Sequence, residues 1–336
     1  MTALDIGAAL PRRRAEILPA LTPLIVMLAA APFVGNPATF VTLTAAGLAM
    51  GMMIFTMASG LTLVFGMMDV LNFGHGAFIA LGAYMAALAL LPLNAWVAAD
   101  SLPLNLAAVM LAALAAALAC GILGWAFERL IVKPVYGQHL RQILATIGGS
   151  IIVVQLIYSF FGPDQIPVTL PKAFEGSFVF GQAAVEKYRL LATVIGLVVF
   201  AAETLILNRT KIGLLIRAGV ENREMVEALG YRIDRLFVGV FMAGSALAGL
   251  GGAMMAFYRG QVHAPMGEEF LVLCFIVIII GGLGSVGGSF VAAILVALIA
   301  NYAGFLAPKL ALVSNILAMV VVLLWRPRGL YPVSGR

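Results

Sequence analysis

Residues 208–235 read NRTKIGLLIRAGVENREMVEALGYRIDR and contain ten charged side chains. The whole chain of 336 residues contains 20 Lys and Arg and 15 Asp and Glu. Residues 236–258, which follow directly, contain none of these four residue types. Charged side chains are expensive inside a bilayer. This stretch, called the island below, is therefore expected to lie outside a membrane between segments that lie within it.

The composition excludes a soluble protein. The chain is 63% hydrophobic and 10% charged, with a mean hydropathy of +1.08, whereas soluble domains carry about 25% charged residues. A helix needs roughly 20 apolar residues to cross the hydrocarbon core, and lipid requires every backbone polar group to be satisfied internally. The sequence contains long runs without any Asp, Glu, Lys or Arg, at 17–68, 70–99, 101–127, 142–162, 236–258, 270–308 and 310–325. We therefore predict an all-α polytopic membrane protein.

We expect about 8–10 transmembrane helices in one membrane domain covering residues 1–336. The predicted spans are 17–34, 40–65, 77–93, 104–127, 144–161, 190–207, 236–257, 270–280, 289–305 and 310–325. The span at 270–280 has only 11 residues, about 17 Å of helix at 1.5 Å per residue. Either it begins earlier and carries Glu268 and Glu269 into the interface, or it is a half-helix.

The distribution of Lys and Arg predicts the orientation. Cytoplasmic loops of membrane proteins carry the excess of these residues. With the N-terminus inside, 15 of the 20 lie on the cytoplasmic side and 5 on the outer side. We therefore expect both termini and the island to be cytoplasmic. The longest outer segment, residues 162–189, is a candidate landing surface for an extracytoplasmic partner.

Glycine patterns in the chain argue for packing rather than nucleotide binding. Residues 282–287 match G-x-G-x-x-G, but no strand precedes them in a βαβ unit, as a dinucleotide site requires. None of the five lysines follows a glycine, so the chain has no P-loop. Gly284 with Gly288 and Gly47 with Gly51 form small-xxx-small pairs, which favour close helix packing.

Isolated polar residues leave several readings open. His75, His139 and His263 have no partner Cys, Asp or Glu at ligand spacing, so no metal site is predicted. His75 fits either a hydrogen bonder at a helix terminus or a proton relay. Asp69, at the end of the second span, fits either a functional intramembrane acid or a solvated interfacial one. Glu203 is expected to reach the inner interface.

Within the island we predict a short amphipathic helix at 221–229. Met225, Val226 and Leu229 fall at helical spacing among charged residues, and Gly230 follows as a C′ residue. A solvated connecting loop is the alternative. An apolar face on a short polar helix indicates docking into a groove of a partner.

Several further stretches carry a resemblance to a known family. They are Asn72-Phe73-Gly74-His75-Gly76, Glu128-Arg129 with Lys133-Pro134, Gly213, Arg217-Ala218, Glu221, Asn222, Ala228-Leu229-Gly230, Arg235, Gly281-Gly282-Leu283-Gly284-Ser285 with Gly288, and Pro327, Gly329 and Leu330. Together they resemble the permease subunits of branched-chain amino-acid ABC importers, more closely the first of the two permease types. The similarity runs from about residue 40 to residue 332, and the first 39 residues depart from the family.

This resemblance implies a type II ABC importer-like permease in the bacterial cell inner membrane. Such a subunit works with a second, homologous permease, two cytoplasmic ATPases and a periplasmic solute-binding protein. It needs no cofactor and is not an enzyme, because the partner subunits hydrolyse ATP. Residues 208–235 would be the coupling loop within the single permease domain, and its predicted ATPase-coupling residues are Arg217, Glu221, Asn222, Met225, Leu229 and Gly230.

Two glycine-rich stretches, residues 72–76 and 281–288, break the helix pattern and are called the first and second break below. They are the predicted translocation pathway, because irregular backbone at membrane depth is tolerated where it lines a cavity. The candidates are Asn72, Gly74, His75, Gly76, Gly281, Gly284, Ser285 and Gly288. Branched-chain amino acids are the first expected substrates, with urea, short amides and aromatic or other carboxylic acids as alternatives. An ATP-independent secondary transporter or channel is the rival function, although mid-span acids for ion coupling are almost lacking. Nothing indicates a nucleic-acid partner, and lipid is the only other contact expected.

Overall fold

The computed structural model describes residues 19–221 and 223–332, and one apolar helix there corresponds to each of the ten predicted spans, with ends that differ by a few residues. These helices are α2 (Thr22–Val34), α3 (Pro37–Met68), α4 (His75–Leu90), α6 (Leu102–Phe127), α7 (His139–Phe161), α8 (Lys187–Arg209), α11 (Ile233–Arg259), α12 (Met266–Gly281), α13 (Val286–Leu306) and α14 (Pro308–Trp325). Within the described ranges, seven helices are long and apolar enough to cross a membrane, and α2, α12 and α14 fall outside that set. The prediction of an all-α polytopic membrane protein is confirmed.

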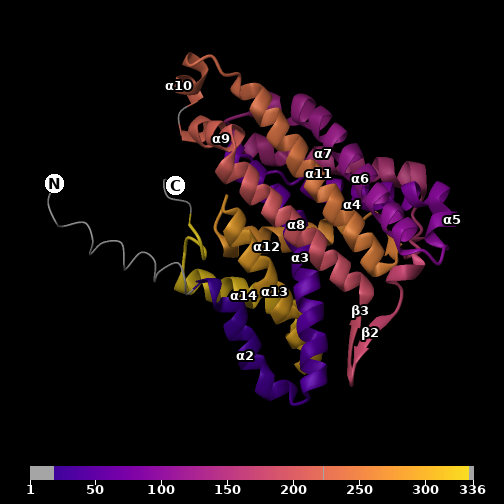
Figure 1. The fold of residues 1–336 in the computed structure, drawn as a ribbon. Coiled ribbons are helices and arrows are strands. Elements are labelled where there is room, and N and C mark those ends of the chain that lie inside the picture. The colour runs from indigo at the N-terminus through magenta and orange to yellow at the C-terminus, as the bar shows by residue number, and fades with distance from the viewer. Residues whose placement is uncertain (1–18, 222, 333–336) are drawn as a thin grey trace.

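Short elements connect these helices. They are η1 (Leu91–Leu93), α5 (Asn94–Val97), η2 (Glu128–Val132, one turn of π-helix), η3 (Lys133–Val135), β1 (Ile166–Pro167), η4 (Lys172–Phe174), β2 (Ser177–Phe180), β3 (Ala183–Glu186), α9 (Lys211–Glu221), α10 (Arg223–Ala228) and β4 (Gln261–Val262). Strand β2 pairs antiparallel with β3, and β1 pairs antiparallel with β4. Figure 1 shows α9 and α10 at one end of the molecule and the β2–β3 hairpin at the other. We call these the island end and the hairpin end.

Local sequence explains where helix α3 begins and ends. Pro37 occupies its first turn, where the missing N–H is not needed, and the Asn36 side-chain oxygen accepts a hydrogen bond from the Ala38 N–H at 2.8 Å. At the other end Asp69 adopts a left-handed conformation, φ 53° and ψ 36°, and its N–H donates to the Phe65 carbonyl. This turn stops the helix and directs the chain into the first glycine-rich break.

The core lies where α3, α4, α11 and α13 meet. In α3, 83% of the most apolar window is buried, against 17% in α8, so α3 is central and α8 peripheral. Helix α11 packs against α3, α4 and α6, and α13 packs against α3. The rings of Phe78, Phe127 and Phe241 join α4, the end of α6 and α11. The bundle is therefore built around one long apolar helix.

Glycines set the distance between the central helices. A Cβ atom on Gly244 would lie 2.6 Å from the Gly60 carbonyl oxygen, so α3 and α11 cross with their backbones in contact. The predicted pair Gly47 and Gly51 faces α13, where added Cβ atoms would lie 2.8 Å from the side chain of Leu298 and 2.9 Å from the Ile294 Cα. The close-packing interpretation of this pair is confirmed.

The helix predicted at 221–229 is present as α10, Arg223–Ala228, but the island also contains a second helix, α9, which the sequence analysis did not predict. Helix α9 begins after Thr210, whose backbone is extended and whose hydroxyl accepts from the Gly213 N–H at 3.4 Å, as an N-cap residue does. Helix α12 begins at Met266 and carries both Glu268 and Glu269 in its first turn, so of the two alternatives for this span the structure supports the earlier start.

Candidate functional site

Helix α9 packs the island against the bundle of membrane helices. Gly213, Ile216 and Gly219 are buried at a spacing of three residues and form its inner face. Ile216 packs with Leu63 of α3 and Val240 of α11 in a small apolar cluster. This contact places α9 across the ends of two membrane helices.

Arg217 of α9 forms hydrogen bonds with the end of α8. Its Nη1 donates to the Leu207 carbonyl at 2.8 Å and to the Asn208 side-chain oxygen at 3.3 Å. The last carbonyls of a helix have no partner within that helix, and a basic side chain there satisfies them. Arg217 therefore ties the end of α8 to α9.

The three apolar residues of the predicted amphipathic helix differ in burial in the structure: one faces the protein and two face outward. Val226 is buried, whereas the side chains of Met225 and Leu229 are 61% and 70% exposed. Helix α10 ends at Ala228, and Gly230, the predicted C′ residue, follows with φ +86° and donates its N–H to the Glu227 carbonyl at 2.9 Å. The predicted coupling residue Asn222 lies outside the described residues, and so does the side chain of Glu221.

The first glycine-rich break is buried at the start of α4. Asn72 and His75 have no exposed surface. The His75 Nε2–H donates to the Met57 carbonyl at 2.8 Å, so His75 is a hydrogen bonder at a helix terminus that joins α4 to α3. Its Nδ1 and both polar atoms of the Asn72 side chain have no hydrogen-bond partner among the described residues.

The glycines of this break are packed against neighbouring elements. A Cβ atom on Gly74 would lie 2.6 Å from the Phe127 ring, and one on Gly76 would lie 2.7 Å from the Gly267 carbonyl oxygen of α12. The rings of Phe73 and Phe275 stand 4.9 Å apart. Helix α12 therefore runs antiparallel to α4 along the break.

The second break joins α12 to α13. The Ser285 hydroxyl accepts from the Gly288 N–H at 3.1 Å and caps α13. The backbones of Gly281 and Gly288 are in contact, and Gly284, with φ +83°, lies against Gly66 of α3. Gly281 ends α12, 14 residues after Gly267 and about 21 Å along the helix. The structure thus places the two breaks along α12 rather than at one point.

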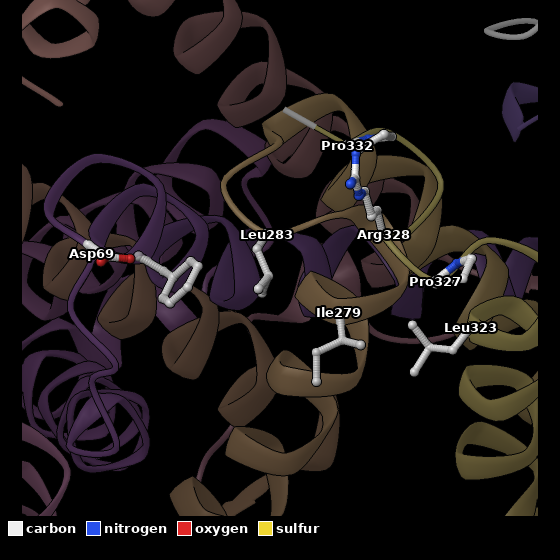
Figure 2. Close-up of a pocket in the computed structure, with 8 residues that line it drawn as sticks. Asp69, Ile279, Leu283, Leu323, Pro327, Arg328 and Pro332 are labelled. Atoms are coloured by element: carbon white, nitrogen blue, oxygen red, sulfur yellow. The ribbon is translucent and has the colours of Figure 1, made fainter. Parts of the chain in front are cut away.

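A cavity of about 310 Å³ lies beside the second break (Figure 2). Its lining residues come from the end of α3, from α12, the break, α14 and the C-terminal segment, and are Phe65, Asp69, Ile279, Leu283, Leu323, Pro327, Arg328 and Pro332. The Leu330 N–H donates to the Ile280 carbonyl at 2.8 Å and the Tyr331 N–H donates to the Gly281 carbonyl at 3.0 Å. None of the eight predicted pathway residues lines this cavity. Sequence reasoning missed it because its walls join three distant parts of the chain.

Glu203 is buried within the bundle. Its residue surface is 7% exposed, and α8 continues for six more residues, about 9 Å, to Arg209. The expectation that it reaches the inner interface stays a prediction. The carboxylate oxygens have no hydrogen-bond partner of good geometry among the described residues, although the Ser59 hydroxyl of α3 faces them. Glu203 is therefore an acid buried inside the helix bundle.

Comparison with known proteins assigns the chain to a family. Residues 43–325 match the family described as the permease component of the branched-chain amino acid transport system. The chain belongs to this family. The match begins within α3 and ends at the last residue of α14, so the family region contains both breaks and the whole island.

Curated relatives extend over most of this permease. It is 27% identical over 292 residues to the high-affinity branched-chain amino acid permease protein BraD of Pseudomonas aeruginosa, covering 84% of this chain and 93% of BraD. It is 25% identical over 291 residues to LivH of Escherichia coli K12, covering 84% and 92%. It is also 28% identical over 345 residues to LivM of the same organism, covering 94% and 75%. No solved structure matches.

Family membership confirms several of the sequence predictions. The chain is a transport subunit of the predicted permease family, and its apolar helices and relatives agree on a multi-pass membrane protein. The LivH and LivM matches show that the chain is related to both types of permease in that system. The site residues and the orientation of the termini remain predictions.

Proposed function

We propose that this chain is the transmembrane permease of an ABC importer for branched-chain amino acids. The observation that carries the proposal is the family match over residues 43–325, which covers nearly all the described membrane helices. Separate ATPase subunits drive the importer, and a periplasmic binding protein delivers the substrate. The related permeases LivH and LivM are both named for branched-chain amino acid transport.

The island supplies the coupling surface in this proposal. Helix α9 is fixed to α3 and α11 by Ile216 and to α8 by Arg217. Helix α10 then presents Met225 and Leu229 as an exposed apolar pair. An amphipathic helix of this kind docks in a groove by its apolar face. A movement of an ATPase against α10 would be transmitted through α9 to the three membrane helices beneath it.

A second permease of the same family completes the membrane part. Exposed apolar surface on α6, α7 and α8 is extensive, and one such face meets the partner while the others meet lipid. We propose that the translocation pathway runs along the glycine-rich breaks. The buried Asn72 side chain, whose polar atoms have no hydrogen-bond partner among the described residues, would meet a polar solute when the helices around the break move apart. A route with few ionisable side chains suits a zwitterion that passes without being held tightly.

The hairpin end is the proposed landing surface for the binding protein. The β2–β3 hairpin presents Phe178, Val179 and Phe180, which are 46%, 69% and 69% exposed. Its base is tied to the bundle, because Ala184 N–H donates to the Thr42 hydroxyl of α3 at 3.3 Å. This end lies opposite the island (Figure 1), as binding-protein and ATPase contacts require.

Uptake into proteoliposomes tests the proposal. Vesicles contain this chain with its partner permease and ATPases, ATP is enclosed, and the binding protein and radiolabelled leucine are outside. We expect uptake that requires ATP, the binding protein and a hydrolysis-competent ATPase. Uptake by this chain alone, driven by an ion gradient, would establish the secondary-transporter alternative. ATP-dependent uptake of urea, short amides or aromatic acids without leucine uptake would change the substrate and keep the class.

A further inference from the structure

A groove runs along the last turns of helix α8, at the end nearest the island. It has a volume of about 450 Å³, and its lining residues are Phe200, Ala201, Thr204, Leu205, Asn208 and Arg209. They form three pairs that recur every four residues, so they share one face of the helix. The groove extends over nine residues of α8, about 14 Å at 1.5 Å per residue. We call it the α8 groove.

The chemical character of the α8 groove changes along its length. Phe200 and Leu205 make its inner part apolar, and the Phe200 ring is fixed by stacking at 4.0 Å on Phe290 of α13. Asn208 and Arg209 line the end nearest the island, where Arg209 is exposed. A phospholipid shows the same order, because its apolar chains are followed by a polar headgroup.

The polar end of the groove carries positive charge that no acid neutralises. Arg217 Nη1 donates to the Asn208 side-chain oxygen at 3.3 Å, which brings a second guanidinium to this end. Residues 204–220 contain three basic side chains and no Asp or Glu. Glu203, the preceding acid in the sequence, is buried inside the bundle. No ion pair joins Arg209 to an acid among the described residues.

These features together select one class of ligand. We propose that the α8 groove binds an anionic phospholipid, with the phosphate at Arg209 and Arg217 and an acyl chain along Phe200 and Leu205. A guanidinium can hold a phosphate through two parallel hydrogen bonds, and basic pockets on the cytoplasmic side of membrane helices bind anionic headgroups. The lipid comes from the inner leaflet in the proposed orientation.

The depth of the groove fits a lipid. Helix α8 has 23 residues and is roughly 35 Å long, slightly more than the hydrocarbon core of about 30 Å. Its last residue, Arg209, therefore reaches the headgroup region, which adds about 5–8 Å on each side of that core. Phe200 lies about 14 Å further into the bilayer, at the level of the acyl chains.

A lipid in this position would stabilise the support of the island. Arg209 ends α8 and Arg217 belongs to α9, so a phosphate held by both joins the two helices, which lie beside each other (Figure 1). Helix α9 in turn carries α10, the proposed coupling helix. We therefore expect ATP-driven uptake to depend on anionic lipid. This consequence rests on the proposed function, whereas the binding itself does not.

Native mass spectrometry of the delipidated complex tests the binding. The purified complex of both permeases and the ATPases is titrated in detergent with phosphatidylglycerol, or with phosphatidylcholine that has the same acyl chains. We expect phosphatidylglycerol to bind more tightly and Arg209→Gln to weaken its binding about fivefold. Arg232→Gln is the matched control, because it removes the charge of an exposed island residue outside the groove, and it should bind as the unmodified complex does.

Three outcomes of this titration would overturn the proposal. They are equal binding of the two lipids, unchanged phosphatidylglycerol binding in Arg209→Gln, and equal weakening in Arg209→Gln and Arg232→Gln. Thermal unfolding of each variant establishes that the fold is unchanged, as expected for substitutions of exposed side chains.

Two further measurements distinguish a lipid from other occupants. Glycerol 1-phosphate has the phosphate without the acyl chains and should not displace phosphatidylglycerol, so displacement at equal concentration would show a simple anion site and refute a lipid site. The same titration is made with the isolated chain. Preferential binding of phosphatidylglycerol by the isolated chain that is lost in the complex would show that a partner subunit covers the groove, and would also refute the proposal.

A transport measurement tests the consequence for the island. Proteoliposomes are made from phosphatidylcholine with and without phosphatidylglycerol. Phosphatidylglycerol should speed uptake by the unmodified complex and by Arg232→Gln, and Arg209→Gln should lose most of this gain. An equal gain in Arg209→Gln would show that the lipid does not support the island. Failure of the proposed function would instead appear as no ATP-driven uptake of leucine in any lipid, whereas lipid binding is measured without substrate or ATP.

Discussion

At the scale of the residue, substitutions at Gly284 and Gly287 can show whether the glycines of the second break serve helix packing or line the translocation pathway. Gly284 has φ +83°, and an added Cβ atom would lie 2.8 Å from the Gly66 Cα, whereas Gly287 has open space. Gly284→Ala should therefore destabilise the purified protein by about 1–3 kcal/mol and reduce uptake, and Gly287→Ala should change neither. Thermal unfolding in detergent measures the first effect. Lost uptake with unchanged stability in Gly284→Ala would show a pathway role instead of packing.

Glu203 gives a second prediction at this scale. An unpaired ionised carboxylate is costly in an apolar interior, and such a group is instead kept neutral. Gln keeps its shape and hydrogen-bonding capacity toward Ser59, so Glu203→Gln should change the free energy of unfolding by less than about 1 kcal/mol. Glu203→Lys should destabilise by about 3 kcal/mol. Both are followed by thermal unfolding and size-exclusion chromatography. Equal destabilisation by Gln and Lys would show that the protein needs the negative charge.

At the scale of the element, helix α10 carries the coupling prediction. Leu229→Asp places a charge on its exposed apolar face and should abolish ATP-driven uptake, while the permease remains in the membrane. Leu214→Asp is the matched control, because Leu214 is 61% exposed on the neighbouring helix α9. Co-purification of the ATPases and uptake are measured for both variants. Normal ATPase association and uptake in Leu229→Asp would exclude α10 as the coupling element.

The elements also show how far sequence reasoning reaches. Long uncharged runs predict the membrane helices, because every segment that crosses lipid must pair its own backbone polar groups and therefore forms a helix. The glycine pair in α3 predicts close packing against another helix, because it leaves a face without side chains, and the structure shows that this helix is α13. Helix α9 was missed because its buried face consists of Gly213, Ile216 and Gly219, two of which carry no apolar side chain. The cavity depends on backbone hydrogen bonds from Leu330 to Ile280, which no local pattern indicates.

At the scale of the whole molecule, the orientation rests on the distribution of Lys and Arg and can be measured by cysteine labelling. Cys120 and Cys274 are both fully buried, so the native thiols give little background. Gln182→Cys places a thiol at the tip of the β2–β3 hairpin, and Glu224→Cys places one on α10; both positions are exposed. A membrane-impermeant maleimide should label the hairpin position in intact spheroplasts.

The same reagent should label the α10 position only after permeabilisation. This outcome is expected because 15 of the 20 Lys and Arg then lie on the cytoplasmic side. The assignments of the island to ATPases and of the hairpin to a binding protein both depend on it, since the two partners work on opposite sides of the membrane. Labelling of α10 in intact spheroplasts, with protection of the hairpin, would show that the protein has the opposite orientation in the membrane.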